Sequence, residues 1–372
     1  MKILHTADLH LDSAFCGGGE SYAQARRERQ RQVLNKIFAT ASDRRCDMIL
    51  IAGDFFDTSY VTPETKELCL SLFRQFGGPI VVSAGNHDPL IEGSFWRGDL
   101  PENVYVFDSS SLSYFEFKEL GVAVGGYSFT SAAMTSAPLE REVARPRTWE
   151  KLILLCAHGD LESPTSRYAP IMSSDVRRLG FDYAALGHVH NLPEITDEHI
   201  RYCGFAEGRS YDEIGDGGVL IIDTGNGGIG IERVVVSEYR YLAEELDVSD
   251  KYTAEQISEA ISKRLTEISG RGQAFVRLEL CGVFSGDGEI DVKGFEGLKR
   301  EGISELRITD STLCLPDKAQ LEKDTSLRGE FYRSLRQELY SEDVSRRRTA
   351  LRALRIGLAA IDGRDFTWGG NV

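Results

Sequence analysis

Short apolar runs, each ending at a polar motif, organise the first half of this chain. They lie at residues 3–6, 48–52, 80–83, 152–157 and 183–186. Runs of this length that are apolar throughout are typical of strands buried on both faces, as in parallel sheets. The pattern predicts five buried strands and places the polar motifs on the loops that follow them.

Between these runs the apolar spacing changes to that of helices. Residues 22–42 carry Val33, Ile37 and Ala41 at intervals of four, and residues 63–76 follow Thr62, which can cap a helix that begins with Pro63. Strand, helix and strand therefore alternate, which predicts an α/β fold. Further extended segments predict a second sheet packed on the first, and they lie at residues 104–107, 122–124, 219–223 and 229–236.

The pattern changes near residue 240. Residues 244–250 are acidic and lack apolar periodicity. The elements predicted beyond them are helices at residues 254–268 and 295–299 and strands at residues 274–281 and 303–308. We therefore expect a first domain over residues 1–240 and a small α+β domain over residues 241–323.

The tail, residues 324–372, is predicted to be helical from residue 324 to residue 361. Apolar side chains recur there with the seven-residue spacing of a coiled coil, at Val344, Leu351, Leu354, Leu358 and Ile361. Two or three heptads more often mark a helix that packs on its own domain. Burial within the chain and docking on a partner therefore both remain open.

Composition is that of an ordinary soluble protein. Of the 372 residues, 41% are apolar and 27% are charged, and no stretch approaches the roughly 20 continuous apolar residues of a membrane span. The first predicted strand begins at once and leaves no room for a signal peptide, and the seven cysteines include no Cys-x-x-Cys pair. Both features predict a cytoplasmic protein with reduced thiols.

The net charge of −15 bears on nucleic-acid binding, because Lys and Arg supply most of the non-specific affinity for phosphates. Local clusters of arginine can bind phosphates even in a chain of negative net charge. Two such clusters are present, one at residues 346–348 and one at Arg26, Arg27, Arg29 and Arg31. A solvated helix face is the more frequent explanation of such clusters, and phosphate contact is the alternative. A DNA-acting protein of this charge would depend on metal ions, local patches and a partner subunit.

Five polar motifs follow the predicted strands and contain five of the seven histidines. They are Asp8-Leu9-His10, Gly53-Asp54, Gly85-Asn86-His87-Asp88, His158-Gly159 and Gly187-His188-Val189-His190. Each has an ordinary explanation alone, such as a helix cap at Asp8 or a tight turn at Gly53. All five in this order, each after a predicted strand, instead indicate a site for two metal ions. We expect His5, inside the first strand, to be packed and not to bind metal.

The chemistry that needs such a set is phosphoester hydrolysis. Two divalent ions about 3.5–4 Å apart can share a carboxylate, lower the pKa of a bound water and clamp the phosphate oxygens. Asp54 is the natural bridging carboxylate, and Asn86 adds a neutral oxygen that limits the negative charge met by an anionic substrate. Imidazole and carboxylate ligands without thiolate suit Mn, Fe or Zn better than Ca or Mg, and Mn is the expected ion.

The motif order D-x-H, GD, GNH(D/E), H and GHxH resembles the calcineurin-like metallophosphoesterase superfamily. Within it, residues 1–11, residues 52–58 and Ala157-His158-Gly159 are similar to the SbcD-type DNA repair exonucleases, which work with SMC-like ATPases. The resemblance implies a four-layer αββα sandwich, a small α+β capping domain and C-terminal helices that grip the ATPase coiled coil. It further implies a DNA nuclease, and it leaves endonuclease activity and a homodimer open.

The resemblance also assigns roles to individual residues. One ion would be held by Asp8, His10, Asp54 and His190, and the second by Asp54, Asn86, His158 and His188. His87 would lie unliganded beside the phosphate, where it could stabilise charge or protonate the leaving oxygen, with Asp88 orienting its ring. Asp57 stands where archaeal and eukaryotic relatives carry a second catalytic histidine, as it does in bacterial SbcD-like proteins.

Two other functions share parts of this pattern. A metallophosphoesterase acting on a nucleotide or another small phosphoester would need the whole metal site. A scaffold subunit of an ATPase complex would not, and the complete ligand set argues against it. The predicted second domain and heptad tail argue against the small-molecule enzyme, which has no need of them.

Overall fold

The chain forms two compact units, Met1–Arg240 and Tyr241–Val372, and each is described by itself. The computed structural model describes residues 1–15, 19–58, 60–140, 151–194, 197–225, 228–249, 251, 253–270, 272–284, 290–314 and 318–363. Within these residues, no helix combines the length and the apolar character needed to span a lipid bilayer. The five cysteines whose side chains are described are all free thiols.

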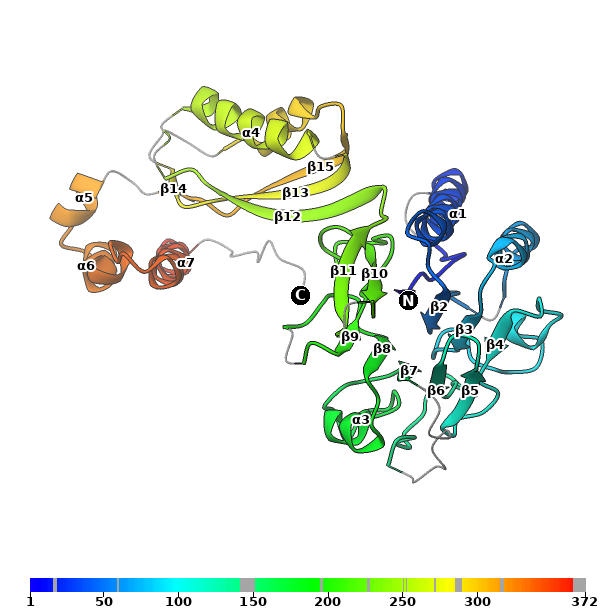
Figure 1. The fold of residues 1–372 in the computed structure, drawn as a ribbon. Coiled ribbons are helices and arrows are strands. Elements are labelled where there is room, and N and C mark those ends of the chain that lie inside the picture. Colours follow the sequence, from blue (N-terminus) through cyan, green and yellow to red (C-terminus); the bar gives the residue numbers. More distant parts are fainter. Residues whose placement is uncertain are drawn as a thin grey trace. The chain divides into compact units, whose positions relative to one another are not determined.

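A six-stranded sheet carries the first three motifs (Figure 1). Its strands, in spatial order, are β11 (Gly230–Val235), β10 (Gly218–Asp223), β1 (Lys2–Thr6), β2 (Met48–Ala52), β3 (Ile80–Ser83) and β4 (Val104–Val106). Strands β1 to β4 run parallel, whereas β10 is antiparallel to both β1 and β11. The predicted strands at residues 48–52 and 80–83 are confirmed without any shift of their ends.

A second sheet of five strands carries the two histidine motifs. Its strands, in spatial order, are β5 (Ser113–Phe117), β6 (Val122–Gly126), β7 (Leu152–His158), β8 (Tyr183–Gly187) and β9 (Ile200–Tyr202). Strands β6 to β9 run parallel, and β5 is antiparallel to β6. Of the extended segments predicted for a second sheet, only residues 122–124 belong to it; residues 104–107, 219–223 and 229–236 correspond to β4, β10 and β11, which join the first sheet instead. Strands β5 and β9 were not predicted, because they lie at the two edges of the sheet and lack the continuous apolar runs of the central strands.

Alternate side chains of the central strands serve different cores. In β2, Leu50 faces the core between the two sheets, and Ile51 faces the core beneath the helices. In β7, Cys156 faces the core between the sheets, and Leu155 faces the outer core of the second sheet. Burying each large aliphatic side chain stabilises the fold by about 1.5–3 kcal/mol, so both faces of each central strand must be covered.

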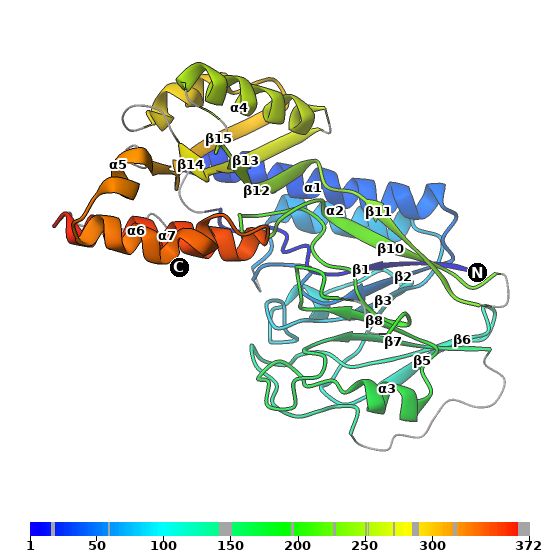
Figure 2. The same cartoon turned by 90° about the vertical axis from the view of Figure 1, so that its left-hand side faces the viewer.

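Helices cover the two outer faces and complete the predicted αββα sandwich. Helices α1 (Gly19–Asp43) and α2 (Pro63–Gln75) pack on the first sheet, and α3 (Ser173–Leu179) packs on the second (Figure 2). The Thr62 side chain caps α2 by accepting a hydrogen bond from the backbone of Thr65, as the sequence predicts.

The second unit contains a three-stranded sheet with one covering helix. The sheet comprises β12 (Tyr239–Asp247), β13 (Gln273–Cys281) and β15 (Ile303–Asp310), and the helix is α4 (Ala254–Ser269). A short helical turn, η2 (Val292–Leu298), and a strand pair, β14 (Val283–Phe284) with β16 (Leu313–Cys314), complete this part. Residues 244–247, which showed no apolar periodicity, belong to β12, because Leu242 and Leu246 pack on the core while the acidic residues between them face outward or lie half-buried.

The described part of the tail contains α6 (Leu327–Leu339) and α7 (Val344–Ile361), and a short helix, α5 (Lys318–Lys323), directly precedes it. The helical tail is therefore confirmed, and residues 340–343 separate α6 from α7. Leu354 and Leu358 of the heptad stripe are buried against Tyr332 and Leu339 of α6. Of the two alternatives left open by the sequence, the structure shows burial within the chain for these two leucines; the side chain of Val344 lies outside the described part.

Candidate metal centre

The motif loops meet at one end of the two parallel strand sets. Strands β1, β2 and β3 share one direction, as do β7 and β8, so their carboxyl ends present the following loops together. Ligand atoms of Asp8, His10, Asp54 and His190 all lie within 4.8 Å of one another. The structure thus brings together the four residues predicted for one ion.

The second predicted group shares Asp54 with the first. Ligand atoms of Asp54, His158 and His188 also lie within 4.8 Å of one another, and Asn86 Oδ1 is 3.0 Å from His158 Nε2. One carboxylate oxygen, Asp54 Oδ2, is 3.7 Å from His10 Nε2 and 3.3 Å from His158 Nε2. Asp54 therefore stands between the two groups, as a bridging carboxylate must.

Hydrogen bonds on the far side of each ring fix the direction of the histidines. Nδ1 of His158 is 3.0 Å from the Ala52 carbonyl, so Nδ1–H donates to that oxygen and Nε2 is left facing the centre. Asp57 holds His10 Nδ1 at 3.0 Å and thereby orients that ring in the same way. His188 is held from the opposite nitrogen, because its Nε2 is 3.3 Å from Asp160 Oδ1.

Burial and charge at the centre match a cation. Asp8 and Asp54 are each 1% exposed, and burial raises the pKa of Asp8 to about 7. Burial also acts to raise the pKa of Asp54, but the neighbouring His158 and His10 rings hold it well below its ordinary value. Two buried carboxylates and several imidazole nitrogens form a donor set that suits divalent ions. When bound, two such ions supply an activated water and positive charge for a phosphate.

The backbone at the centre is held in unusual conformations. Four candidate ligands have positive φ angles, which are 52° for Asp8, 46° for His10, 48° for Asp54 and 111° for His188. Residues other than glycine rarely adopt this region, and such strain gathers at functional sites. Gly85 is needed for close approach, because a Cβ there would lie 2.2 Å from Asp54 Oδ1.

His87 and Asp88 do not form the pair that the sequence analysis expected. The Asp88 carboxylate accepts hydrogen bonds from the backbone of Gly85, Phe55 and Phe56 and from Trp96 Nε1, and it makes none with the His87 ring. Asp88 thus fixes the loop that presents Asp54. His87 Nδ1 is instead 3.1 Å from the Asp57 carbonyl oxygen, and its ring is part-exposed beside His10. The prediction that Asp88 orients His87 is wrong, because buried donors occupy its oxygens.

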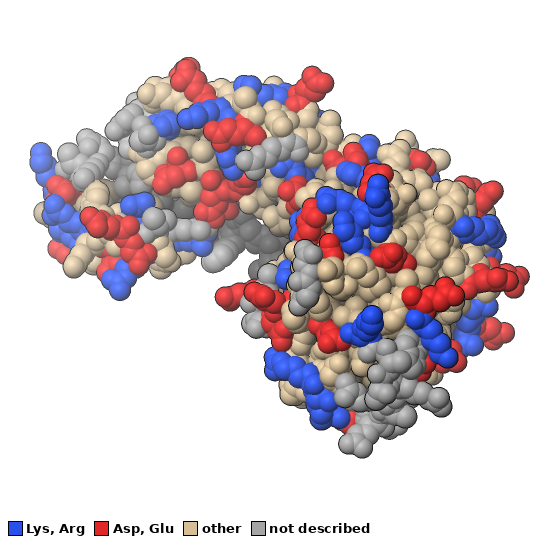
Figure 3. All heavy atoms as spheres, in the orientation of Figure 1, with Lys and Arg blue, Asp and Glu red and all other residues tan. Residues whose placement is uncertain are grey.

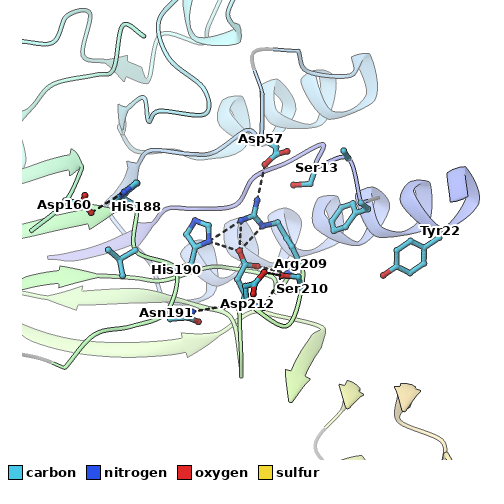
Figure 4. A pocket seen from close by; sticks show the side chains of 14 residues that line it. Ser13, Tyr22, Asp57, Asp160, His188, His190, Asn191, Arg209, Ser210 and Asp212 are labelled. Carbon is cyan, nitrogen blue, oxygen red and sulfur yellow. Dashed lines mark hydrogen bonds and ion pairs between the residues drawn. The ribbon is translucent and has the colours of Figure 1, made fainter. Parts of the chain in front are cut away.

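His190 has partners that the sequence analysis missed. Its Nδ1 is 2.7 Å from Glu213 Oε1, and Arg209 donates to the same oxygen at 2.6 Å (Figure 4). Arg209 also contacts Asp57 Oδ1 at 3.1 Å, so one guanidinium joins the carboxylates that hold His10 and His190. The only sequence signal was a polar run shortly after the last motif.

A third set of side chains also approaches metal-binding spacing. Ligand atoms of His10, Asp57 and His87 lie within 4.8 Å of one another. The Asp57 oxygen in this set already contacts the Arg209 guanidinium, and a second cation at the same oxygen would be repelled. The two groups that share Asp54 therefore remain the better pair of ion sites.

His5 lies behind the centre, as predicted. It is fully buried, with Nδ1 3.0 Å from the Tyr183 hydroxyl and Nε2 3.1 Å from the Leu186 carbonyl. Burial lowers the pKa of His5 to about 3, so the ring stays neutral. Both ring nitrogens have protein partners, which leaves neither for a metal ion.

The fold and the paired ligand groups define the chain as a metal-dependent phosphoesterase. Residues 1–192 match the sequence profile of the calcineurin-like phosphoesterase family, and the chain belongs to that family. It is also similar to the uncharacterized metallophosphoesterase YhaO of Bacillus subtilis (strain 168). The two are 27% identical over 369 residues, an alignment that covers 93% of this chain and 88% of that protein.

Proposed function

We propose that this chain is a cytoplasmic, metal-dependent DNA nuclease, an SbcD-like exonuclease that hydrolyses phosphodiesters in DNA repair with Mn as its ion. The observation that carries the proposal is the position of Asp54 between the two ligand groups. The similarity of residues 1–11 and 52–58 to SbcD-type nucleases supports DNA as the substrate. Phosphate would bind beside His87, whose ring is 45% exposed and can donate a proton to the leaving oxygen.

The same geometry supports the ligand assignment. Asp8, His10, Asp54 and His190 would hold one ion, and Asp54, Asn86, His158 and His188 would hold the other. Asp57 and Glu213 would keep the His10 and His190 rings turned toward their ion. Asp88 would keep Asp54 in place through the shared loop contacts.

The second unit would serve the nuclease in two ways. Its α+β part, residues 241–323, would cap the active site, as the resemblance implies. Its tail helices would bind an SMC-like ATPase subunit. Because Leu354 and Leu358 are buried within the chain, the ATPase would contact the outer face of these helices, where Ile356 and Leu327 are exposed.

Charge pairing favours a second candidate function, hydrolysis of a nucleotide or another small phosphoester. Arg27 pairs with Glu20 at 2.6 Å, and Arg31 pairs with Glu28 at 2.8 Å. Figure 3 shows Lys and Arg mixed with Asp and Glu over the visible face. Arg27 and Arg31 therefore have acidic partners that DNA phosphates would have to displace, whereas a small substrate needs only the centre itself.

Substrate preference and the salt dependence of activity distinguish the two functions. Purified protein with Mn would be tested on end-labelled linear DNA, on a nucleotide and on bis(p-nitrophenyl) phosphate at 50 and 200 mM salt. A DNA nuclease should degrade the DNA and lose that activity steeply with salt, since phosphate contacts release counterions, while hydrolysis of the chromogenic diester changes little. Activity on the nucleotide and the diester without DNA cleavage would support the small phosphoester instead.

A further inference from the structure

The pocket beside the candidate metal centre has an aromatic wall. The pocket has a volume of about 740 Å³ and extends from His188 and His190 to Phe15 and Tyr22. This lies within the range of roughly 300–1,000 Å³ typical of small-ligand sites. Figure 4 shows Tyr22 reaching from α1 on the side of the view opposite His188. A ligand whose phosphate lies at the centre can therefore place a neighbouring group against the two rings.

A buried arginine braces the two rings from within the protein. The Arg26 guanidinium carbon lies 4.8 Å from the ring centroid of Phe15 and 5.9 Å from that of Tyr22. Arg26 also donates to the Tyr22 hydroxyl at 3.2 Å and to the Gly208 carbonyl at 2.7 Å. Because Arg26 is only 4% exposed, it holds the rings in place and does not itself reach a ligand.

Phe15 keeps its ring at the pocket in spite of an unfavourable backbone. Its φ angle is 47°, in the left-handed region that a bulky side chain rarely adopts. A glycine would relieve this strain but would remove the ring. Strained residues cluster at functional sites, so this conformation at a pocket wall is consistent with a function for the Phe15 side chain.

We propose that Phe15 and Tyr22 form a stacking platform for the base of an unpaired nucleotide whose phosphodiester lies at the metal centre. The proposal rests on the DNA nuclease function proposed above and adds the part of the substrate that the pocket receives. Aromatic rings stack on the flat face of any base, so the platform tolerates every sequence. A base held in a duplex is stacked between its neighbours, and the platform therefore favours a strand end that is single-stranded.

The test compares two single-stranded oligonucleotides that differ at one position. One carries a normal nucleotide at the end that is removed, and the other carries an abasic tetrahydrofuran unit there. With Mn, the wild-type protein should cleave the normal end at least about 10-fold faster, since stacking on an aromatic ring typically contributes about 5- to 150-fold per base. Phe15→Leu and Tyr22→Leu should each bring the ratio of the two rates toward one.

Two control variants separate the ring from other effects. Tyr22→Phe keeps the ring and loses only the hydroxyl, so it should keep most of the rate ratio. Tyr340→Leu removes a ring that is 54% exposed and lies outside the pocket, and it should keep the full ratio. A 2-aminopurine at the oligonucleotide end gives a binding readout without cleavage, because stacking should quench its fluorescence in the wild type and less in Tyr22→Leu.

Each remaining outcome decides against the platform. Wild-type cleavage of the normal and abasic ends at equal rates would overturn the platform and leave the nuclease function standing. The same holds if Tyr22→Leu keeps the wild-type rate ratio and the full 2-aminopurine quenching. Hydrolysis of bis(p-nitrophenyl) phosphate by a protein that cleaves neither oligonucleotide would overturn the nuclease function and the platform together.

Discussion

The Nε2 atoms of His10 and His190 lie 3.1 Å apart, although 180 positions separate the two residues in the chain. The Nδ1 atom of each ring faces a carboxylate, Asp57 for His10 and Glu213 for His190. With both protons on Nδ1, both Nε2 lone pairs point at the same space. A cation held by both rings would remove this repulsion, and the carboxylates of Asp8 and Asp54 border the same space.

Arg209→Lys should weaken metal binding without unfolding the protein. The planar Arg209 guanidinium donates hydrogen bonds to both Asp57 and Glu213. A lysine ammonium is a single point of charge and cannot replace both hydrogen bonds. Loss of support for the ring orientation should reduce affinity for one of two Mn ions by roughly 10- to 100-fold. Calorimetric Mn titration measures this, with the more exposed Arg177→Lys as the matched control. Two unchanged binding steps would show that Arg209 does not support the ligands.

Asp54→Asn should lose both metal ions and hydrolytic activity together. Its carboxylate is shared by the two ligand groups, and the amide removes the charge that both would use. Metal content after dialysis and hydrolysis of bis(p-nitrophenyl) phosphate are the measurements. Asp43→Asn, an exposed change at the end of α1, is the control. Normal turnover by metal-depleted Asp54→Asn protein would contradict the shared-ligand arrangement.

His87→Ala should separate turnover from metal content. The ring is part-exposed, and its Nδ1 faces a backbone carbonyl, which leaves Nε2 for the substrate. Turnover should fall by about 100- to 10,000-fold, the range for a lost general acid, while the protein keeps its metal. His199→Ala, at an exposed position outside the motifs, should behave as the wild type. A His87→Ala protein that arrives without metal would place His87 among the ligands.

The sequence was sufficient to predict the central strands and to select seven residues that the fold brings together at one centre. Continuous apolar runs such as residues 48–52 are stable only when both faces of the strand are covered. The motif after each run therefore lies at the carboxyl end of a buried parallel strand, on the same edge of the sheet as the other motifs. Partners such as Glu213 and Arg209 could not be predicted, because they lie on a loop whose path depends on the assembled fold. Asp88 illustrates the opposite error, a contact that the sequence suggested and the structure lacks. Asp88 is adjacent to His87 in the sequence, but its carboxylate accepts hydrogen bonds from buried backbone N–H groups instead of contacting the His87 ring.

Glu207→Gln should change how stability depends on pH. Burial raises the pKa of Glu207 from 4.5 to about 7, even though Arg26 and Arg29 act to lower it. Between pH 4.5 and pH 7, Glu207 is therefore protonated more often in the folded state than in the unfolded state. The contribution of this proton to stability is complete below pH 4.5 and is lost as the pH rises through 7. Between pH 5 and pH 8, the unfolding free energy of the wild type should therefore fall relative to that of Glu207→Gln, which cannot ionise. The difference between the two proteins should reach up to about 3 kcal/mol.

Urea unfolding of the wild type and Glu207→Gln at pH 5 and pH 8 measures the effect. Glu238→Gln is the control, because that carboxylate is 41% exposed and pairs with Lys36 at 3.1 Å. Equal pH dependence in the wild type and Glu207→Gln would show that Glu207 ionises as easily in the folded protein as in the unfolded chain.

Leu354→Asp and Ile356→Asp should separate the two faces of α7. Leu354 is fully buried against α6, so a carboxylate there should lower the stability of the second unit by about 3–5 kcal/mol and cause aggregation. Ile356 is 41% exposed, so the same substitution should leave the thermal melt near that of the wild type. If the outer face binds an ATPase coiled coil, Ile356→Asp should abolish co-purification with the ATPase while the fold stays intact. A lowered melt for Ile356→Asp, or an unchanged complex, would reject this face as the binding surface.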